Sequence, residues 1–268
     1  MTVENGLPPI EEAHLQVKDL NIGYCKYGQG SVNFLFIPGA VGCYKKDFPE
    51  NVIRSFDPNF ATIVSIDPPG YGTSRPPDRV QEVHRCKKDA EYCLELMKQL
   101  KLTPFVVVGW SEGGRTAVHV GGIGKTLVSH MILLATSTRV DFRGDMAFKG
   151  MRNTKQWLAS SREPYLEHYD EEFLSFQWAA LCDVVAAVYR DLGGRFPSDY
   201  VLGNIKMPLL LINGGNDRFI MDPKYIKEKA PQAQLEIHTQ GGHDLHIKYP
   251  KWFSLKVSTF VKQNPPKK

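Results

Sequence analysis

The stretch Phe105-Val-Val-Val-Gly-Trp-Ser-Glu-Gly-Gly114 decides how the rest of the chain is interpreted. An apolar run leads directly into Gly109-Trp110-Ser111-Glu112-Gly113, a G-x-S-x-G pattern followed by residues that are compatible with a helix. A serine at a sharp strand-to-helix turn exposes its hydroxyl, and the flanking glycines allow close approach of the backbone. The pattern alone is weak, but its strand-and-helix context predicts that Ser111 is a nucleophile.

The overall composition is that of a soluble globular protein with one large α/β domain or two small ones. Of the 268 residues, 42% are hydrophobic and 23% are charged. The net charge is +4, and no basic stripe is present that would predict nucleic-acid binding. No apolar run approaches the roughly 20 residues that cross a bilayer, so no membrane association is expected.

The termini and cysteines predict a cytoplasmic protein. The opening Met1-Thr-Val-Glu-Asn-Gly6 has neither the apolar segment of a secretion signal nor an Arg-rich import pattern. Five cysteines without a C-x-x-C pair suit free thiols in a reducing compartment. The sequence leaves the oligomeric state open, and a monomer is compatible with it.

Short apolar runs closed by Pro or Gly indicate buried parallel strands, and they alternate with helical patterns. Residues 14–27 suggest an antiparallel hairpin that turns at 19–21. Asp222-Pro223 is typical of a helix start. The alternation predicts an α/β fold with a mostly parallel, doubly wound sheet and a ligand site at the carboxyl ends of its strands. Strands are predicted at 33–37, 61–66, 105–110, 129–134, 209–212 and near 234–238, and helices from the apolar spacing of Val83, Cys86, Ala90, Cys93, Met97, Leu100 and of Phe253, Val257, Phe260, Val261.

Residues 138–204 interrupt this alternation because they contain no strand-like run. Such an excursion is too long for a loop, and it leaves and returns where sites form. It is predicted to be a helical lid over the site, between the two parts of the core, 1–137 and 205–268. The alternative is a packed helical subdomain without contact to substrate. The segment is rich in aromatic residues, namely Phe142, Phe148, Trp157, Tyr165, Tyr169, Phe173, Phe176 and Trp178.

A serine nucleophile needs a base, and the base needs an acid that fixes its tautomer. In this type of fold the order along the chain is serine, acid, histidine. Asp217 follows the strand predicted at 209–212, and His243 follows the last strand within Gln240-Gly-Gly-His243. The sequence therefore predicts a catalytic triad of Ser111, Asp217 and His243.

Nearby residues are weaker candidates for these roles. Asp222 is better explained as a helix cap, and Asp244 is adjacent to His243, where a hydrogen bond to the imidazole is rarely formed. His246 lies where the last helix begins and is predicted to be structural. Trp110 is predicted to pack beside the turn, although its ring could also wall the pocket.

Acyl transfer also needs donors for the developing oxyanion. The backbone N–H of Glu112, directly after the nucleophile, is one predicted donor. The second is expected from the loop Pro38-Gly-Ala-Val-Gly42, where Ala40 is preferred and Val41 is the alternative. Phe219, two residues after the acid, is predicted to wall the acyl pocket. No metal and no cofactor are expected.

With these pieces in place, the chain resembles the α/β-hydrolase superfamily, and within it the biphenyl hydrolase-like proteins known as valacyclovir hydrolases. The resemblance implies the α/β-hydrolase fold and a serine esterase that cleaves small esters, with some preference for α-amino acid esters. It also implies the triad Ser111, Asp217 and His243. The segments that carry it are Pro38–Gly42, Asp67-Pro-Pro-Gly-Tyr-Gly-Thr-Ser-Arg-Pro-Pro-Asp78, Gly109–Gly114 and Gly242-His-Asp-Leu-His246.

Glu112 departs from the pattern of this branch, in which the residue after the nucleophile is typically Asp and is thought to attract the substrate ammonium. The Glu112 carboxylate could take over that role within a partly dry pocket. It could instead form an ion pair with Arg115, three positions further along the same helix. Both roles stay open at this stage, and the preference for amino esters depends on which one holds.

Two other functions compete with an esterase. Related members hydrolyse a carbon–carbon bond of ring-cleavage products with the same triad. A catalytically silent scaffold is the alternative from another class, although such members usually lack one of the triad residues. Haloalkane dehalogenase and epoxide hydrolase chemistry is disfavoured because those relatives place Asp where Ser111 stands.

Overall fold

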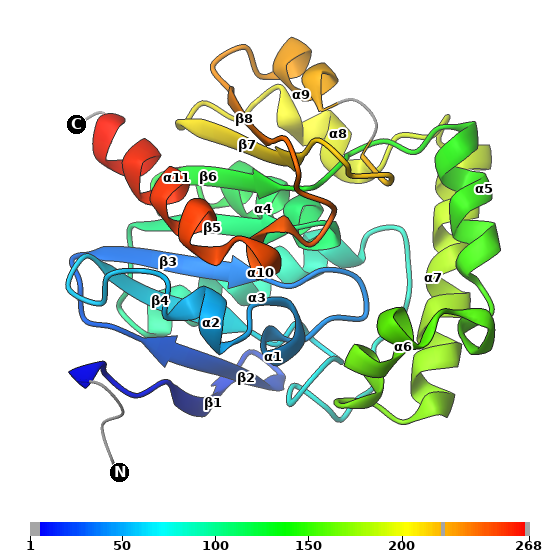
Figure 1. Ribbon diagram of the computed structural model, residues 1–268, viewed down its shortest axis with the longest axis horizontal. Coiled ribbons are helices and arrows are strands. Elements are labelled where there is room, and N and C mark those ends of the chain that lie inside the picture. The colour runs from blue at the N-terminus through cyan, green and yellow to red at the C-terminus, as the bar shows by residue number, and fades with distance from the viewer. Residues whose placement is uncertain (1–5, 221–222, 266–268) are drawn as a thin grey trace.

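The computed structural model describes residues 6–220 and 223–265 and is built around an eight-stranded sheet (Figure 1). The strand order is β1-β2-β4-β3-β5-β6-β7-β8. The β1–β2 and β2–β4 pairs are antiparallel and all other pairs are parallel. The predicted α/β class with a mostly parallel sheet is therefore confirmed. The strands are β1 (Glu11–Val17), β2 (Leu20–Tyr27), β3 (Val32–Ile37), β4 (Ala61–Ile66), β5 (Phe105–Trp110), β6 (Val128–Leu134), β7 (Leu209–Gly214) and β8 (Gln234–His238).

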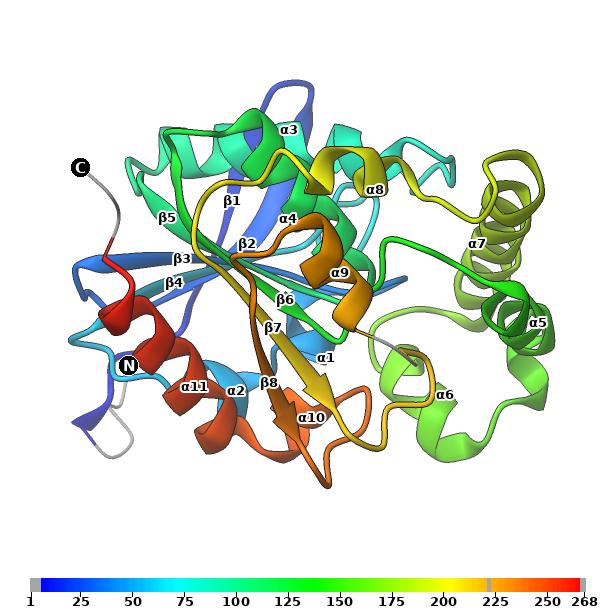
Figure 2. The same ribbon diagram turned by 90° about the horizontal axis from the view of Figure 1, so that it is seen from above.

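The central strands are apolar on both sides because helices cover both faces of the sheet. Every residue of β4, β5 and β7 is buried. Figure 2 shows α3, α4, α8 and α9 along one face, with α1, α2, α10 and α11 along the other. These helices are α1 (Tyr44–Asp47), α2 (Glu50–Ile53), α3 (Arg85–Gln99), α4 (Glu112–Ile123), α8 (Pro197–Leu202), α9 (Lys224–Lys229), α10 (Leu245–Lys248) and α11 (Pro250–Gln263).

Between β6 and β7 the chain leaves the sheet and forms a helical layer at one end of the molecule (Figure 1). Two backbone hydrogen bonds join the segment that leaves the sheet to the segment that returns. The Val140 amide donates to the Gly194 carbonyl oxygen at 2.8 Å, and the Phe196 amide donates to the Thr138 carbonyl oxygen at 3.0 Å. This layer has an apolar core of its own, in which Phe173, Trp178 and Leu181 are buried. Its helices are α5 (Phe142–Met151), a short 3₁₀ helix (Thr154–Gln156), α6 (Ala159–Leu166) and α7 (Glu171–Asp191).

The region predicted as a lid, 138–204, thus contains helices and an isolated bridge but no strand among its described residues. Its last helix, α8, packs against α3 and α4, and Leu202 belongs to the core of the sheet. The helices that stand away from the sheet are therefore α5 to α7.

One described helix, α7, is long and apolar enough to cross a membrane by length and composition alone. Half of its apolar 18-residue window is buried inside the molecule. Leu174, Leu181 and Val185 are fully buried in the apolar core of the helical layer. Packing within the protein therefore accounts for the apolar character of α7.

One predicted boundary differs from the structure, and another lies outside its described residues. The first hairpin turns at Lys18 and Asp19, one residue before the predicted turn, and Lys18 adopts a φ of 53° there. Asp222, predicted to cap a helix, lies outside the described residues. Its neighbour Pro223 immediately precedes α9, which begins at Lys224.

Candidate active site

Ser111 lies on the sharp turn between β5 and α4, with φ 53° and ψ −117°. This conformation is unfavourable for a residue with a side chain and must be held by its surroundings. A Cβ on Gly113 would lie 2.2 Å from the Ile37 carbonyl oxygen, and one on Gly109 would lie 2.2 Å from that of Gly113. Both glycines of the motif are therefore needed for the close backbone approach that the sequence predicted.

The structure brings together the three side chains that were predicted to form a triad. His243 Nε2 lies 3.0 Å from the Ser111 hydroxyl oxygen. On the other side of the ring, Nδ1 lies 2.9 Å from Asp217 Oδ2. The serine follows β5, the aspartate follows β7 and the histidine follows β8, so all three stand at the carboxyl ends of parallel strands.

Asp217 is fixed by two further hydrogen bonds. Its Oδ1 accepts the amide of Phe219 at 2.8 Å and that of Ile220 at 3.2 Å. Its side chain is fully buried, which limits competition by water for the carboxylate. The imidazole therefore meets a carboxylate whose orientation is already set by the backbone.

His243 is held by aromatic neighbours. The Trp110 indole donates from Nε1 to the His243 carbonyl oxygen at 2.8 Å, and the two ring centres are 5.3 Å apart. Trp110 thus packs beside the turn, lines the pocket and anchors the histidine loop. Phe219 covers another side of the imidazole, with ring centres 4.9 Å apart, and is 50% exposed.

The weaker candidates lie outside this arrangement. His246 is fully buried, and its Nε2 is 2.7 Å from the Asp47 carbonyl oxygen. Burial lowers the pKa of His246 to about 3, so the ring is neutral and structural. Asp244 pairs with Lys248 at 3.2 Å on the next helical turn.

Two backbone amides close to the nucleophile are candidate oxyanion donors. Glu112 opens α4, where the first amides have no partner within the helix. A Cβ on Gly39 would lie 3.3 Å from the Ser111 Cβ, so the loop after β3 passes directly beside the serine. Ala40 lines the pocket there, whereas Val41 is fully buried with φ 51°. These positions favour Ala40 over Val41 as the second donor.

Asp47 supports this loop, a role that no sequence motif indicates. The Gly39 amide donates to Asp47 Oδ2 at 2.9 Å, and the other carboxylate oxygen contacts Lys46. The Lys46 ammonium lies 4.0 Å from the centre of the Tyr165 ring of α6. Since no spacing rule links a helical Asp to a loop eight residues earlier, only the tertiary structure shows this role.

Glu112 is buried within a set of guanidinium groups. Its Oε1 contacts an Arg85 guanidinium nitrogen directly and lies 3.8 Å from Arg115 Nη1. Burial alone would raise the pKa of Glu112, but Arg85, Arg115 and Arg79 outweigh it and hold that pKa below its usual value. The predicted pairing with Arg115 is present. The closer partner is Arg85, which lies 27 positions away in the sequence, where no local spacing predicts a pairing.

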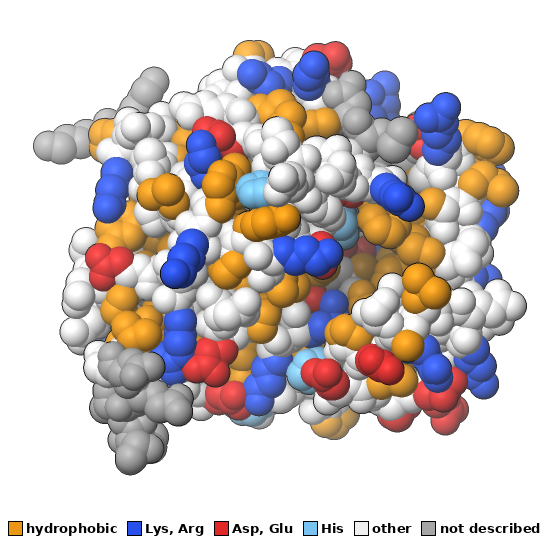
Figure 3. Space-filling view, viewed as in Figure 1, with side chains coloured by type: hydrophobic (Ala, Val, Ile, Leu, Met, Phe, Trp, Pro, Cys, Tyr) orange, Lys and Arg blue, Asp and Glu red, His pale blue; other side chains and the backbone are white. Residues whose placement is uncertain are grey.

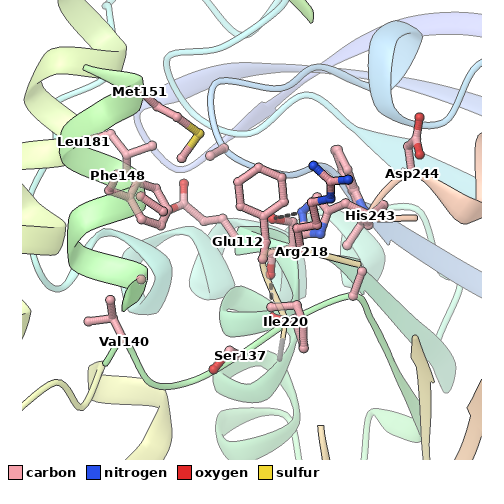
Figure 4. Close-up of a pocket in the computed structure, with 18 of the residues that line it drawn as sticks. Glu112, Ser137, Val140, Phe148, Met151, Leu181, Arg218, Ile220, His243 and Asp244 are labelled. Atoms are coloured by element: carbon pink, nitrogen blue, oxygen red, sulfur yellow. Dashed lines mark hydrogen bonds between the residues drawn. The ribbon is translucent and has the colours of Figure 1, made fainter. Parts of the chain in front are cut away.

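A cavity of about 730 Å³ opens over Ser111 between the sheet and the helices α5 to α7. Figure 3 shows this face hollowed between the core and these helices, with hydrophobic side chains inside. In Figure 4, Phe148, Met151 and Leu181 of these helices lie on one side of the pocket, and Arg218, His243 and Asp244 on the other. The charged side chains that line it are Lys46, Arg115, Arg139, Arg143 and Arg218 against Glu112, Asp141 and Asp244.

No group of three His, Cys, Asp or Glu side chains within residues 6–220 and 223–265 is placed to hold a metal ion. The five cysteines are buried and unpaired.

Two curated proteins of similar sequence are serine hydrolases by name. The chain is 25% identical to human "Serine hydrolase BPHL" over 256 residues, which is 94% of this chain and 87% of the relative. The mouse protein of the same name is 26% identical over the same coverage. The predicted resemblance to the biphenyl hydrolase-like proteins is confirmed.

Solved structures share the fold at lower identity. A serine hydrolase involved in carbazole degradation superposes with a TM-score of 0.74 at 18% identity, covering 95% of this chain and all of the other. A meta-cleavage product hydrolase gives a TM-score of 0.73, also at 18% identity, and covers 94% and 98%. The sequence model of the Alpha/beta hydrolase family matches residues 34–254. With its fold, its turn at Ser111 and this match, the chain belongs to the alpha/beta hydrolase family.

Proposed function

We propose that the protein is a serine hydrolase of the carboxylesterase type, which cleaves small esters through Ser111, His243 and Asp217. The observation that carries the proposal is the continuous pair of contacts from the Ser111 hydroxyl to His243 at 3.0 Å and from His243 to Asp217 at 2.9 Å. A serine hydroxyl becomes an effective nucleophile near neutral pH when an oriented imidazole can accept its proton.

In the proposed reaction, Ser111 Oγ attacks the ester carbonyl carbon while His243 Nε2 takes up the hydroxyl proton. Asp217 holds the imidazole in the required tautomer and stabilises the imidazolium. The amides of Ala40 and Glu112 donate to the tetrahedral oxyanion. His243 then protonates the leaving alcohol, and an acyl-enzyme remains on Ser111. Water, deprotonated by His243, releases the carboxylic acid and restores the serine.

The pocket supports a small substrate that is largely enclosed. Its volume of about 730 Å³ lies within the usual range for small-molecule sites. Phe148 of α5 and Leu181 of α7 lie across this space from His243 of the core (Figure 4), and Phe219 also lines it. We infer that α5 to α7 act as a lid that limits which acyl and alcohol groups enter, and that Phe219 walls the acyl side.

The decisive test replaces the nucleophile. Ser111→Ala should abolish turnover of short-chain esters to the background rate, and a fluorophosphonate probe should label the wild-type protein but not this variant. Ser31→Ala, at an exposed position away from the pocket, is the matched control and should keep both properties. Ester turnover by Ser111→Ala above background would remove Ser111 from the proposed role.

Two other outcomes separate the alternatives. Turnover of a ring-cleavage dienoate with little ester hydrolysis would assign the same triad to carbon–carbon bond hydrolysis. A folded wild-type protein that neither turns over substrate nor takes the fluorophosphonate label would instead be a scaffold.

A further inference from the structure

We propose that Arg115 is an anchor for a carboxylate of the substrate, so that the preferred substrates are esters with a second, free carboxylate on a short acyl chain. This inference rests on the proposed esterase function and names the substrate class of the same site.

The first observation is an imbalance among buried charges beside the nucleophile. Three guanidinium groups, of Arg79, Arg85 and Arg115, are buried together with only two carboxylates, of Asp89 and Glu112. Arg79 forms a two-point pair with Asp89, at 3.1 and 2.5 Å. Arg85 makes the direct contact with Glu112. Arg115 is therefore left with a shared carboxylate at 3.8 Å, which is too distant for a hydrogen bond.

The second observation is that the Arg115 side chain forms no hydrogen bond to any described residue. Its side chain is only 10% exposed, and its Nε and Nη1 are buried without a partner. The guanidinium lies over the Phe196 ring at 3.8 Å, which fixes its position. Because an arginine has five donors and remains charged in proteins, burying two of its nitrogens without hydrogen-bond partners is costly. A carboxylate that enters the site would offset this cost with charge-assisted hydrogen bonds.

The third observation is the place of Arg115. It lines the same cavity as Ser111 and lies in the first turn of α4, four residues after Ser111, which is the N-cap residue of that helix. Four residues correspond to about 6 Å along a helix axis. This separation suits a spacer of two or three carbons between the free carboxylate and the ester carbonyl.

The remaining charges of the cavity agree with an anionic substrate. Five cationic side chains line it against three carboxylates, and two of the five are paired with carboxylates outside the lining, Lys46 with Asp47 and Arg139 with Asp199. Of these carboxylates, Glu112 already contacts Arg85, Asp244 pairs with Lys248, and Asp141 accepts the Gly144 amide as a helix cap. A substrate ammonium would thus meet a carboxylate that is already neutralised, in surroundings with an excess of positive charge. The contacts favour an ion-pairing role for Glu112 over recognition of an amino ester.

The test uses three ethyl esters with matched acyl chains: monoethyl glutarate, ethyl pentanoate and ethyl 4-aminobutyrate. Their acyl chains end in a carboxylate, a methyl group and an ammonium, respectively. The wild-type enzyme should show a kcat/KM at least tenfold higher for the glutarate monoester than for the pentanoate, and the lowest value for the aminobutyrate. Equal values for the first two, or a preference for the ammonium, would overturn the inference.

Variants then locate the anchor. Arg115→Met should lower the ratio of kcat/KM for glutarate over pentanoate at least tenfold, mainly through KM for the glutarate ester. Arg190→Met, at an exposed position on α7, is the matched control and should keep the wild-type ratio. If Arg143→Met removes the preference and Arg115→Met does not, the anchor lies on α5 and the inference is wrong.

A measurement on the wild-type chain covers the case in which Arg115→Met does not fold. Free glutarate should inhibit hydrolysis of ethyl pentanoate competitively, and at least tenfold more strongly than pentanamide. Equal inhibition would contradict the inference while the esterase proposal stands. If instead no ester is hydrolysed, calorimetric titration of glutarate into the wild-type protein still tests Arg115: binding supports the anchor, and no binding contradicts it.

Discussion

At the scale of single residues, Asp217 has the most constrained environment of the three proposed catalytic groups. It accepts hydrogen bonds from two backbone amides and from the imidazole of His243. The Asp217→Asn variant should lower kcat for esters by about 10³- to 10⁴-fold, because an amide group can favour the wrong tautomer of the imidazole. Steady-state rates at constant pH measure this effect.

The matched control for Asp217 is Asp244→Asn. Asp244 is adjacent to His243 in sequence but pairs with Lys248 instead. We expect its kcat to stay within about twofold of the wild-type value, because the Asp244 side chain lines the pocket but forms no described hydrogen bond to Ser111 or His243. A loss of similar size in both variants would mean that the general charge near the histidine matters, rather than the contact of Asp217 with Nδ1.

A second prediction at this scale concerns the contribution of Glu112 to the unfolding free energy. Glu112→Gln removes the carboxylate that neutralises Arg85 and leaves a buried charge unpaired. Removing one partner of a buried ion pair typically costs about 3–5 kcal/mol of unfolding free energy. Glu228→Gln, at an exposed position, should change it by less than about 0.5 kcal/mol. Urea denaturation measures both variants, and a near-neutral result for Glu112→Gln would show that Arg85 finds another partner.

At the scale of elements, the strands were the most predictable part of the fold. The runs predicted at 61–66 and near 234–238 coincide with β4 and β8. β4 could be recognised because it is a short apolar run bounded by turn residues, and every residue of it is buried. The helix predicted from the spacing of Val83 to Leu100 is α3, whose buried face contains Cys86, Ala90, Cys93 and Met97.

The parts that could not be predicted depend on contacts between elements. Arg85 stands near the start of α3 and pairs with Glu112 at the start of α4, but the spacing of 27 residues follows no local rule. Sequence periodicity identifies neighbours three or four residues apart on one helix, so it suggests only Arg115 as a partner of Glu112. The support of Gly39 by Asp47 was missed for the same reason.

The junction of β5 and α4 can be tested through its glycine. In Gly113→Ala the new methyl group would lie 2.2 Å from the Ile37 carbonyl oxygen and 2.4 Å from that of Pro38, both on rigid backbone. We expect a loss of about 1–3 kcal/mol of unfolding free energy, as for other overpacked sites, together with a marked fall in ester turnover because Ser111 and the Ala40 loop shift apart.

Gly150→Ala is the control for this substitution. Gly150 lies in α5, and a Cβ there would meet no atom within 4 Å. Alanine is the better helix former, so unfolding free energy should stay equal or rise by up to about 1 kcal/mol. If both variants lose similar stability, close packing at the turn does not explain the requirement for Gly113.

At the scale of the whole molecule, the burial of histidines sets a dependence of stability on pH. Burial lowers the pKa of His119 to about 4 and that of His246 to about 3. In the unfolded chain both rings titrate near 6.5. Below that pH the unfolded state binds more protons than the folded state, so the unfolding free energy must fall as the pH falls. The folded state is therefore expected to lose stability between pH 6.5 and 4, by up to about 1.4 kcal/mol per pH unit and histidine.

His119→Gln isolates one of these contributions. His119 lies on α4 and is 4% exposed, and its pKa is lowered mainly by burial and secondarily by Lys87 and His84. Between pH 6.5 and 5, the unfolding free energy of the variant should fall less steeply than that of the wild type, since the glutamine takes up no proton on unfolding. Urea denaturation at several pH values measures the two slopes. Because the wild-type and variant chains share every carboxylate, their difference reports the histidine alone, and parallel slopes would mean that His119 is protonated inside the folded protein.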